Sequence, residues 1–380
     1  MANDWLKLPP NGLTRRNFLR GAAAAAAAIP IMTEAKLAWA SQQTKQFGAN
    51  STGKVLLNAN ENPLGPSEAA LRAIDELGAR CGRYDFNAAV DLAKLITAQE
   101  GLKDGYLALY AGSSEPLHFS VLAFTSAAHG LVCAAPSSEA PGMAAAAANV
   151  PVHYVPLRSD YAHDVRRMAA IDPNAGCFYI CNPNNPTGSV TTRDDLYWLL
   201  EHKPRHAVVI VDEAYIHFSD AKTMLDCAVA DRDVIVLRTF SKIYGMAGLR
   251  LGFAVGRPDL LAKLQLYGMN PLPLPGMVAA RECLQDKDLV PTRKKLNASI
   301  RDASIAWVRT QNFGVVPSQA NCFMVDVRRP GAEFVKAMAK RNVYIGRTWP
   351  AWPTHVRITV GTEEEMQLFQ QAFAEVAKLS

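Results

Sequence analysis

Short, almost continuously apolar segments recur along this chain, and the stretches between them are long enough for helices. An apolar side chain at nearly every position, rather than at every second one, is typical of a strand buried on both faces. We therefore expect an α/β fold with a mainly parallel sheet that is covered by helices on both faces. The seven expected strands lie at 107–110, 131–135, 152–156, 177–181, 207–211, 234–238 and 250–255. A Gly-rich link of about a dozen residues joins the last two, which leaves an antiparallel or irregular connection open there.

The pattern changes near residue 286. A long amphipathic helix is predicted at 286–313, a second helix at 331–341, and a closing helix after the strand-like segment "HVRITVGT". This mixture predicts a smaller α+β domain over 286–380, which follows a large domain over 81–285. Residues 41–80 are expected to form an N-terminal arm and part of the small domain.

The N-terminal region, residues 1–40, has the features of a targeting signal. Two adjacent arginines in "TRRNFLR" (14–20) precede an Ala-rich apolar stretch of about a dozen residues, the usual length of a signal core. The stretch is shorter than the roughly twenty residues that span a bilayer, and Ala38-Trp39-Ala40 fits the small-x-small rule for cleavage. The segment resembles a twin-arginine signal, so we expect contact with the twin-arginine (Tat) export machinery, cleavage after Ala40 and a periplasmic protein without a membrane span. A disordered tail or helical arm with two chance arginines is the alternative.

Charge and cysteine content narrow the function classes. The chain has a formal net charge of +5, and 35 basic and 33 acidic residues remain without the first forty positions. So small an excess gives no case for a nucleic-acid surface. The seven cysteines are odd in number and several lie in apolar runs such as "GCFYICN", where a thiol behaves as a small buried hydrophobe. We expect neither a disulfide framework nor a metal site, since no cysteine pair has histidines nearby at ligand spacing.

Two segments carry polar side chains where expected strands end. "CNPNNPTGS" (181–189) has the Pro, Asn and Gly residues of a turn, at the edge where open α/β sheets bind ligands. A turn without another role is the alternative. Asp212 ends the apolar run "VVIVD", where a carboxylate loses solvation and needs a cation or hydrogen bonds; a helix cap is the alternative.

A lysine lies among apolar and Gly residues in "RTFSKIYGMAGLRLG" (238–252). A lysine in a water-poor site near other positive charge becomes a usable amine nucleophile, whereas an isolated Lys is ordinarily a solvated surface charge. Its neighbours favour the first interpretation for Lys242, and Arg250 would supply a fixed cation for an anionic group. Arg357, in "VRITVGT", is either a similar anion ligand or an exposed edge-strand arginine.

Together these segments resemble the class I/II pyridoxal-phosphate aminotransferases, in particular the histidinol-phosphate aminotransferase-like branch. The resemblance runs from about residue 55 to the C-terminus and rests on seven ordered motifs: "LNANENPLGP", "GRYD", "AGSSE", "NPNNPTG", "VDEAY", "RTFSKIYGMAGLRLG" and "VRITVGT". It implies the fold of the fold-type I transferases that depend on pyridoxal phosphate (PLP).

The resemblance also implies a role for each matched residue around the PLP ring. The Lys242 amine would condense with the cofactor aldehyde and later move a proton to or from the substrate α-carbon. Asp212 would keep the ring nitrogen protonated, and Asn185 and Tyr215 would bind the ring's 3-oxygen.

The phosphate and the substrate have their own implied ligands. Phosphate ligands are expected at Ser113, Ser114, Ser241, Arg250 and, from a neighbouring subunit of a homodimer with shared active sites, Tyr84. Substrate ligands are expected at Arg357 for the α-carboxylate, and at Asn185, Arg347 and Asn60. Ser138 departs from the family pattern, because relatives usually carry there an aromatic ring that stacks on the cofactor.

We therefore expect an aminotransferase that exchanges an amino group between an amino acid or amino-acid-like metabolite and a 2-oxo acid. A decarboxylase or oxidase on the same scaffold, or a histidinol-phosphate transaminase, is an alternative. A binding protein without catalysis would have no use for both Lys242 and Asp212.

Overall fold

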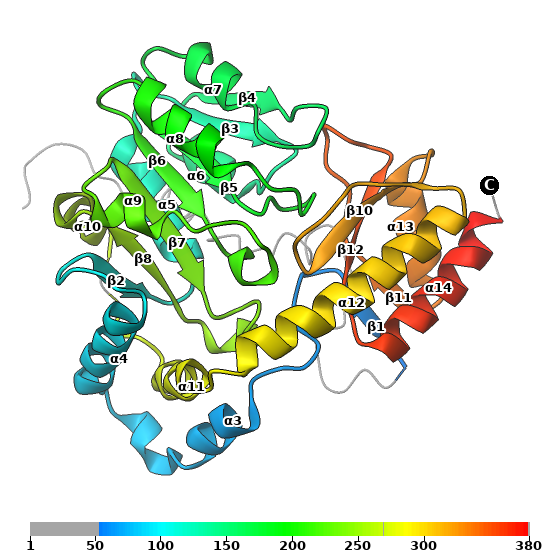
Figure 1. The fold of residues 1–380 in the computed structure, drawn as a ribbon, viewed down its shortest axis with the longest axis horizontal. Coiled ribbons are helices and arrows are strands. Elements are labelled where there is room, and N and C mark those ends of the chain that lie inside the picture. Colours follow the sequence, from blue (N-terminus) through cyan, green and yellow to red (C-terminus); the bar gives the residue numbers. More distant parts are fainter. Residues whose placement is uncertain (1–52, 269, 379–380) are drawn as a thin grey trace, which may run out of the picture.

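The computed structural model describes residues 53–268 and 270–378 (Figure 1). The twin-arginine segment and the predicted cleavage point after Ala40 lie outside the described residues. Within the described part of the chain, no helix combines the length and apolarity needed to cross a membrane.

A single seven-stranded sheet forms the centre of the larger half of the molecule, which confirms the predicted α/β class. In spatial order its strands are β2 (Leu107–Tyr110), β8 (Gly252–Gly256), β7 (Val234–Thr239), β6 (Val208–Asp212), β5 (Cys177–Cys181), β3 (Leu131–Ala135) and β4 (Val152–Pro156). Neighbours from β7 to β4 are parallel, whereas β8 runs antiparallel to both β7 and β2. The short Gly-rich link before β8 thus makes an antiparallel connection, because it is too short for a crossover helix.

One predicted strand begins later than expected. Arg250 has φ 50° and ψ 72°, in the left-handed region, and follows the short helix η3 (Ala247–Leu249). Extended structure therefore starts only at Gly252. This turn places the Arg250 side chain at the edge of the sheet rather than within it.

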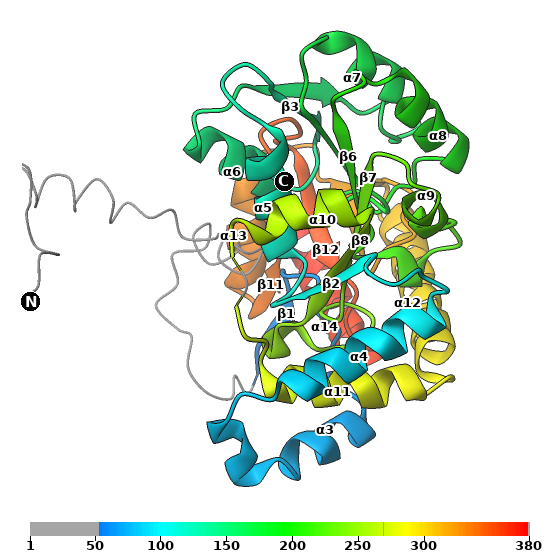
Figure 2. The same cartoon turned by 90° about the vertical axis from the view of Figure 1, so that its left-hand side faces the viewer.

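Helices cover both faces of the sheet (Figure 2). On one face lie α5 (Ser114–Phe124), α6 (Ala140–Ala147) and α10 (Pro258–Gln265), and on the other α7 (Val165–Ile171), α8 (Arg193–His202) and α9 (Leu225–Val229). Because both faces are covered, β5, β6 and β8 are buried at every position, as their apolar runs predict. At the lower end of Figure 1 lie α3 (Glu68–Asp75), the short helix η1 (Gly78–Gly82), α4 (Phe86–Gln99) and α11 (Leu274–Gln285). Helix α11 packs against both α3 and α4.

Within the described residues, the smaller half of the molecule contains two small sheets and three helices. Its antiparallel sheet has the order β12 (His355–Thr359), β10 (Cys322–Asp326) and β9 (Gly314–Val315). A separate parallel pair joins β1 (Val55–Leu57) to β11 (Val343–Ile345), so the start of the described chain pairs with residues far along the sequence. The helices of this half are α12 (Leu289–Thr310), α13 (Gly331–Ala339) and α14 (Glu363–Ala377).

Two helices of this second half show local signals that the sequence carries. Helix α14 begins with a capping box, in which Thr362 and Glu365 each satisfy the other's backbone amide. Helix α12 starts two residues before Pro291 and extends from the large sheet to the small domain (Figure 1). The short helix η2 (Ile216–Phe218) follows β6 in the chain and packs against α12.

Candidate active site

A cavity of about 340 Å³ opens where the central strands β5, β6 and β7 end, at Cys181, Asp212 and Thr239. This is the edge at which open α/β sheets bind ligands. Nine residues singled out in the sequence line it together: Ser113, Ser114, Ser138, Asn185, Asp212, Tyr215, Ser241, Lys242 and Arg250. The fold therefore gathers side chains from four of the seven motifs, together with Ser138, around one space.

The amine of Lys242 belongs to a residue in the wall of this cavity. Its Nζ donates a hydrogen bond to the carbonyl of Ala59 at 3.3 Å and lies 5.5 Å from the centroid of the Tyr215 ring. Lys242 directly follows β7 and the tightly bonded Thr239–Ser241 turn, in which the Thr239 hydroxyl donates to Ser241 Oγ at 2.9 Å. A short rigid connection to a central strand thus holds the amine.

The carboxylate of Asp212 is buried at the end of β6 and bound on both oxygens. The phenol of Tyr179, on the adjacent strand β5, donates to Oδ2 at 2.9 Å, and the amide of Ala214 donates to Oδ1 at 3.1 Å. Burial raises the pKa of Tyr179 well above its ordinary value, the Asp212 charge raises it further, and a hydrogen bond with Ser138 opposes both. Tyr179 therefore stays protonated and acts as a donor to Asp212.

An anion-binding cup lies at the start of α5. Ser113 and Ser114 present this helix N-terminus to the cavity, and Arg250 lies opposite, with its Nη2 bonded to the carbonyl of Ala111 at 3.3 Å. Burial lowers the pKa of the Arg250 guanidinium, an effect that the Glu115 charge opposes. A Cβ on Gly112 would lie 2.2 Å from Nη2, so glycine is needed for the guanidinium to approach. A helix N-terminus and an arginine together suit a phosphate group.

Asn60 contacts Tyr215 from behind the cavity wall. It is fully buried, does not line the cavity, and donates from Nδ2 to the Tyr215 hydroxyl at 3.2 Å and to Cys322 Sγ at 3.2 Å. Its backbone amide and Oδ1 are both bonded to the Thr359 hydroxyl at 3.0 Å. Asn60 thus positions Tyr215 from behind, while its neighbours Ala59 and Glu61 line the cavity. A contact between Asn60 and a substrate side chain stays a prediction.

A hydrogen bond between residues far apart in the sequence connects Arg357 to the cavity-lining Asn185. Its Nη1 donates to Asn185 Oδ1 at 2.7 Å, and its Nη2 donates to the carbonyl of Asn58 at 2.7 Å. The side chain is 2% exposed on the buried strand β12, which excludes the alternative of an exposed edge-strand arginine. Asn185 lines the cavity, so Arg357 lies directly behind its wall.

Two further predicted residues lie away from the cavity wall. Arg347 is bonded to Glu139 and covers the ring of Trp349, with its Cζ 4.2 Å from the ring centroid. Tyr84 is 75% exposed, and its ring stacks on that of Phe86 at a centroid distance of 6.0 Å. Neither residue contacts the cavity within one chain.

A buried ion pair between Arg238, on β7, and Glu213, which follows β6, joins the ends of these two strands. Glu213, next to Asp212, accepts from Arg238 Nε at 2.8 Å and from the amide of Met224 at 2.7 Å. The side chains of Arg238 and Glu213 are 5% and 1% exposed. Of the two adjacent carboxylates, Glu213 therefore has the structural role.

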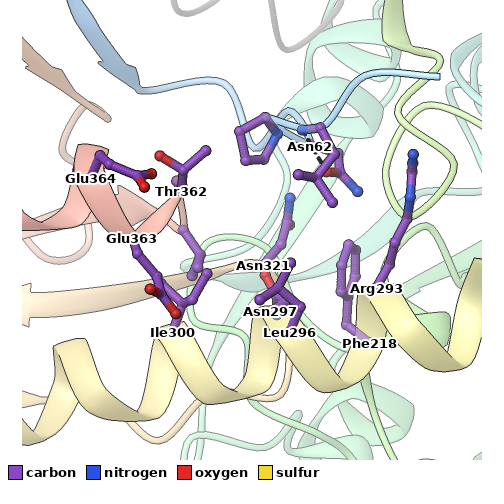
Figure 3. Close-up of a pocket in the computed structure, with 14 residues that line it drawn as sticks. Asn62, Phe218, Arg293, Leu296, Asn297, Ile300, Asn321, Thr362, Glu363 and Glu364 are labelled. Carbon is purple, nitrogen blue, oxygen red and sulfur yellow. Dashed lines mark hydrogen bonds between the residues drawn. The ribbon is translucent and has the colours of Figure 1, made fainter. Parts of the chain in front are cut away.

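A second cavity, of about 380 Å³, lies between α12, the start of α14 and the segment 62–64 (Figure 3). None of the predicted cofactor or substrate ligands lines it. Asn62 Nδ2 and Arg293 Nη1 each donate to the carbonyl of Ile243 at 3.0 Å, which joins its wall to the residue after Lys242. Its lining offers no amine nucleophile, so the chemistry belongs to the cavity lined by Lys242.

The sequence family described as Aminotransferase class I and II matches residues 52–373. The chain belongs to this family. It is 34% identical over 323 residues to the histidinol-phosphate aminotransferase of Symbiobacterium thermophilum, a match that covers 84% of this chain and 89% of the relative.

Solved structures of aminotransferases have the same fold as this chain. A structure of a histidinol-phosphate aminotransferase from Erwinia carotovora, described as putative, has a TM-score of 0.83 at 30% identity, over 88% of this chain and 99% of that one. The Sinorhizobium meliloti histidinol-phosphate aminotransferase, solved with pyridoxal-5'-phosphate, has a TM-score of 0.78 at 22% identity, over 89% and 97%. This aminotransferase thus has the predicted fold and uses pyridoxal phosphate.

The residues present fit that cofactor. Bound pyridoxal phosphate supplies an aldehyde that condenses with amines and a ring that withdraws electrons from the substrate carbon. The cup of Ser113, Ser114 and Arg250 would hold its phosphate, and Asp212 would hold a proton at its ring nitrogen. The Lys242 amine would carry the proton that leaves and returns at the substrate α-carbon, and Arg357 would orient the α-carboxylate.

Sequence reasoning missed Tyr179, Glu139 and Trp349. Tyr179 lies within an apolar strand run, where an aromatic residue ordinarily packs in the core. A signal existed, because a tyrosine buried on a central strand must find a partner for its hydroxyl. Glu139 and Trp349 carry no local motif, and only the fold brings Arg347 to Glu139 and Trp349 to the carbonyl of Ser137.

Proposed function

We propose that this aminotransferase moves an amino group between an α-amino acid or amino-acid-like metabolite and a 2-oxo acid, and that it does so in the periplasm. One observation carries the reaction: the Lys242 amine and the doubly bonded Asp212 line a cavity whose Asn185 wall is bonded to Arg357. A nucleophile, a ring acid and a carboxylate ligand are the minimum for α-amino-group transfer.

The experiment is a panel of amino donors and 2-oxo acids with analysis of the products. Purified protein that begins at Ser41 should be yellow, and Lys242→Ala should abolish or shift the absorbance band because the amine that condenses with the cofactor is lost. Lys340→Ala, at an exposed lysine of the small domain, is the matched control and should keep the band. A colourless protein that gains no band with added pyridoxal phosphate would contradict the assignment.

A second candidate function is decarboxylation or oxidation on the same scaffold. Ser138 supports it, because this residue lines the cavity where family members usually carry a stacking ring. Release of carbon dioxide or peroxide without a new amino acid would favour this reaction. Histidinol phosphate belongs in the donor panel, since the relatives bear the name of histidinol-phosphate aminotransferases.

The periplasmic location rests on the twin-arginine motif at 14–20 and the site after Ala40. Export of a folded, cofactor-loaded protein would suit seven cysteines of which six are buried in the fold. Arg15→Lys with Arg16→Lys should retain the protein in the cytoplasm, as measured by fractionation. Unchanged export would contradict the proposal.

A homodimer with shared active sites is part of the proposal. Tyr84 and Phe86 are 75% and 67% exposed, and Val90 and Leu71 nearby in sequence are also exposed apolar residues. An apolar face of this kind favours a protein partner. Sedimentation should give twice the chain mass, and Tyr84→Phe should weaken cofactor binding if its hydroxyl reaches the partner's phosphate cup. A monomer with an intact cofactor band would contradict the shared site.

A further inference from the structure

We propose that Glu139 makes this enzyme select amino donors whose anionic end is a single carboxylate, and discriminate against donors that end in a phosphate ester. The inference deepens the proposed transaminase function and rests on it. It concerns the Arg357 end of the cavity.

The charge of Arg347 is largely neutralised by an ion pair. Its Nη2 lies 2.5 Å from Glu139 Oε2, and the two side chains are only 17% and 28% exposed. Its Nη1 donates to the carbonyl of Thr348 at 3.3 Å. Partial burial makes such a pair stronger than one on the surface, because water screens it less. Arg347 therefore presents little net positive charge to a ligand.

This pair lies next to the reaction cavity. Glu139 stands between Ser138 and Ala140, which both line the cavity. The buried Trp349 connects the pair to the carboxylate site, since the Cζ atoms of Arg347 and Arg357 lie 4.2 Å and 5.3 Å from the centroid of its ring. Trp349 is itself fixed by a 3.0 Å hydrogen bond from Nε1 to the carbonyl of Ser137.

The arrangement suits one negative charge better than two. A carboxylate carries a single charge, which one guanidinium matches through a two-point hydrogen bond. A phosphate monoester carries about −1.5 to −2 at pH 7 and gains from a second cation. Arg347 is the second arginine on the Trp349 ring, but Glu139 already neutralises it. The Glu139 carboxylate, next in sequence to the cavity-lining Ser138 and Ala140, would also repel the second charge of a phosphate.

The test compares L-histidine with L-histidinol phosphate, which share an imidazole side chain and differ in the anionic end. Each is titrated into the holoenzyme, and the change in cofactor absorbance gives its dissociation constant. We expect wild type to bind L-histidine more tightly. Glu139→Gln should free Arg347 and raise the affinity for L-histidinol phosphate by about tenfold or more, as expected for one unscreened charge near a second.

The matched variants isolate the ion pair. Glu139→Gln combined with Arg347→Gln should lose the gain in phosphate-ester affinity, because the freed cation is gone. Glu333→Gln, at an exposed glutamate in the first turn of α13, should change neither affinity.

The failure of this inference is distinguishable from failure of the transaminase function. An unchanged affinity of Glu139→Gln for L-histidinol phosphate, or tighter binding of that ligand than of L-histidine by wild type, overturns the role of Glu139. If no α-amino acid, L-glutamate included, changes the cofactor absorbance of wild type or yields an oxo acid, the transaminase function itself fails.

Discussion

Tyr179 donates a 2.9 Å hydrogen bond to Asp212 Oδ2 across the two central strands β5 and β6, and both side chains are buried. The neighbouring β5 and β6 run parallel and pair in register, with Tyr179 beside Ile210 and Cys181 beside Asp212. The sheet itself thus sets the direction of the carboxylate. Partners that orient a ligand-binding group in this way commonly affect binding as much as the group itself.

Tyr179→Phe should therefore weaken cofactor binding and lower kcat by about tenfold, since a buried carboxylate loses one of its two donors. Equilibrium dialysis of pyridoxal phosphate and steady-state kinetics measure the two effects. Tyr106→Phe is the matched control, because Tyr106 donates to the exposed Asp231 far from the cavity. Equal behaviour of the two variants would show that the Tyr179 hydroxyl has no part in holding Asp212.

Gly112→Ala should reduce cofactor affinity by about tenfold or more, because a lost hydrogen bond between a guanidinium and a phosphate costs about 1.5–3 kcal/mol. Gly112 has φ +87°, and the added Cβ would lie 2.2 Å from Arg250 Nη2, which displaces the guanidinium from the phosphate cup. Gly314→Ala, whose Cβ would make only an ordinary 3.8 Å contact with Asp326, should bind the cofactor like wild type. An unchanged affinity in Gly112→Ala would argue against Arg250 as a phosphate ligand.

Arg238→Met should lower the free energy of unfolding by about 3–5 kcal/mol, because it leaves the charge of Glu213 buried without its cation. Chemical denaturation followed by fluorescence measures this. The double variant Arg238→Met with Glu213→Leu should be more stable than Arg238→Met alone, since no unpaired charge remains. If the double variant were the less stable one, the neutral hydrogen bonds of Glu213, rather than its charge, would dominate.

The free energy of unfolding should also fall at acid pH, because His217 is buried in its neutral form. Burial, with a smaller contribution from the Arg238 charge, lowers the pKa of His217 from 6.5 to about 3. The unfolded chain therefore binds a proton between these values that the folded chain does not, so stability present above pH 6.5 is lost as the pH falls toward 3.

The measurement is chemical denaturation from pH 7 to pH 4.5 on wild type and His217→Asn. Wild type should lose up to about 1.4 kcal/mol more per pH unit than the variant, the value for one proton. His129→Asn, at an exposed histidine, should keep the slope of wild type. Parallel slopes for wild type and His217→Asn would show that this ring does not carry the acid sensitivity.

Much of the fold could be read from local patterns. Each of the seven strands of the main sheet lies within two residues of its predicted position, because burial on both faces leaves a continuous apolar run. The pairing of β1 with β11 could not be read in the same way. These strands are three residues long and lie nearly 300 positions apart, and so short a run has no periodicity to detect.

The active-site residues also show which features the sequence reveals and which only the fold reveals. The types and order of Asp212, Lys242 and Arg250 were evident because each stands where an apolar strand or a Gly-rich turn would otherwise exclude charge. A charged residue within an apolar or Gly-rich segment can be recognised from the sequence alone. It identifies which groups react, but not what holds them.

The contacts that hold these groups come from the tertiary structure. Only the fold shows that Asn60 stands behind Tyr215, and that Glu139 meets Arg347 across more than 200 residues of chain. A hydrogen bond or ion pair depends on separations of a few ångströms, and the sequence distance between its partners carries no information about that separation. The reactive amine and acid are therefore properties of the sequence, whereas their orientation and the charge offered to a substrate are properties of the folded chain.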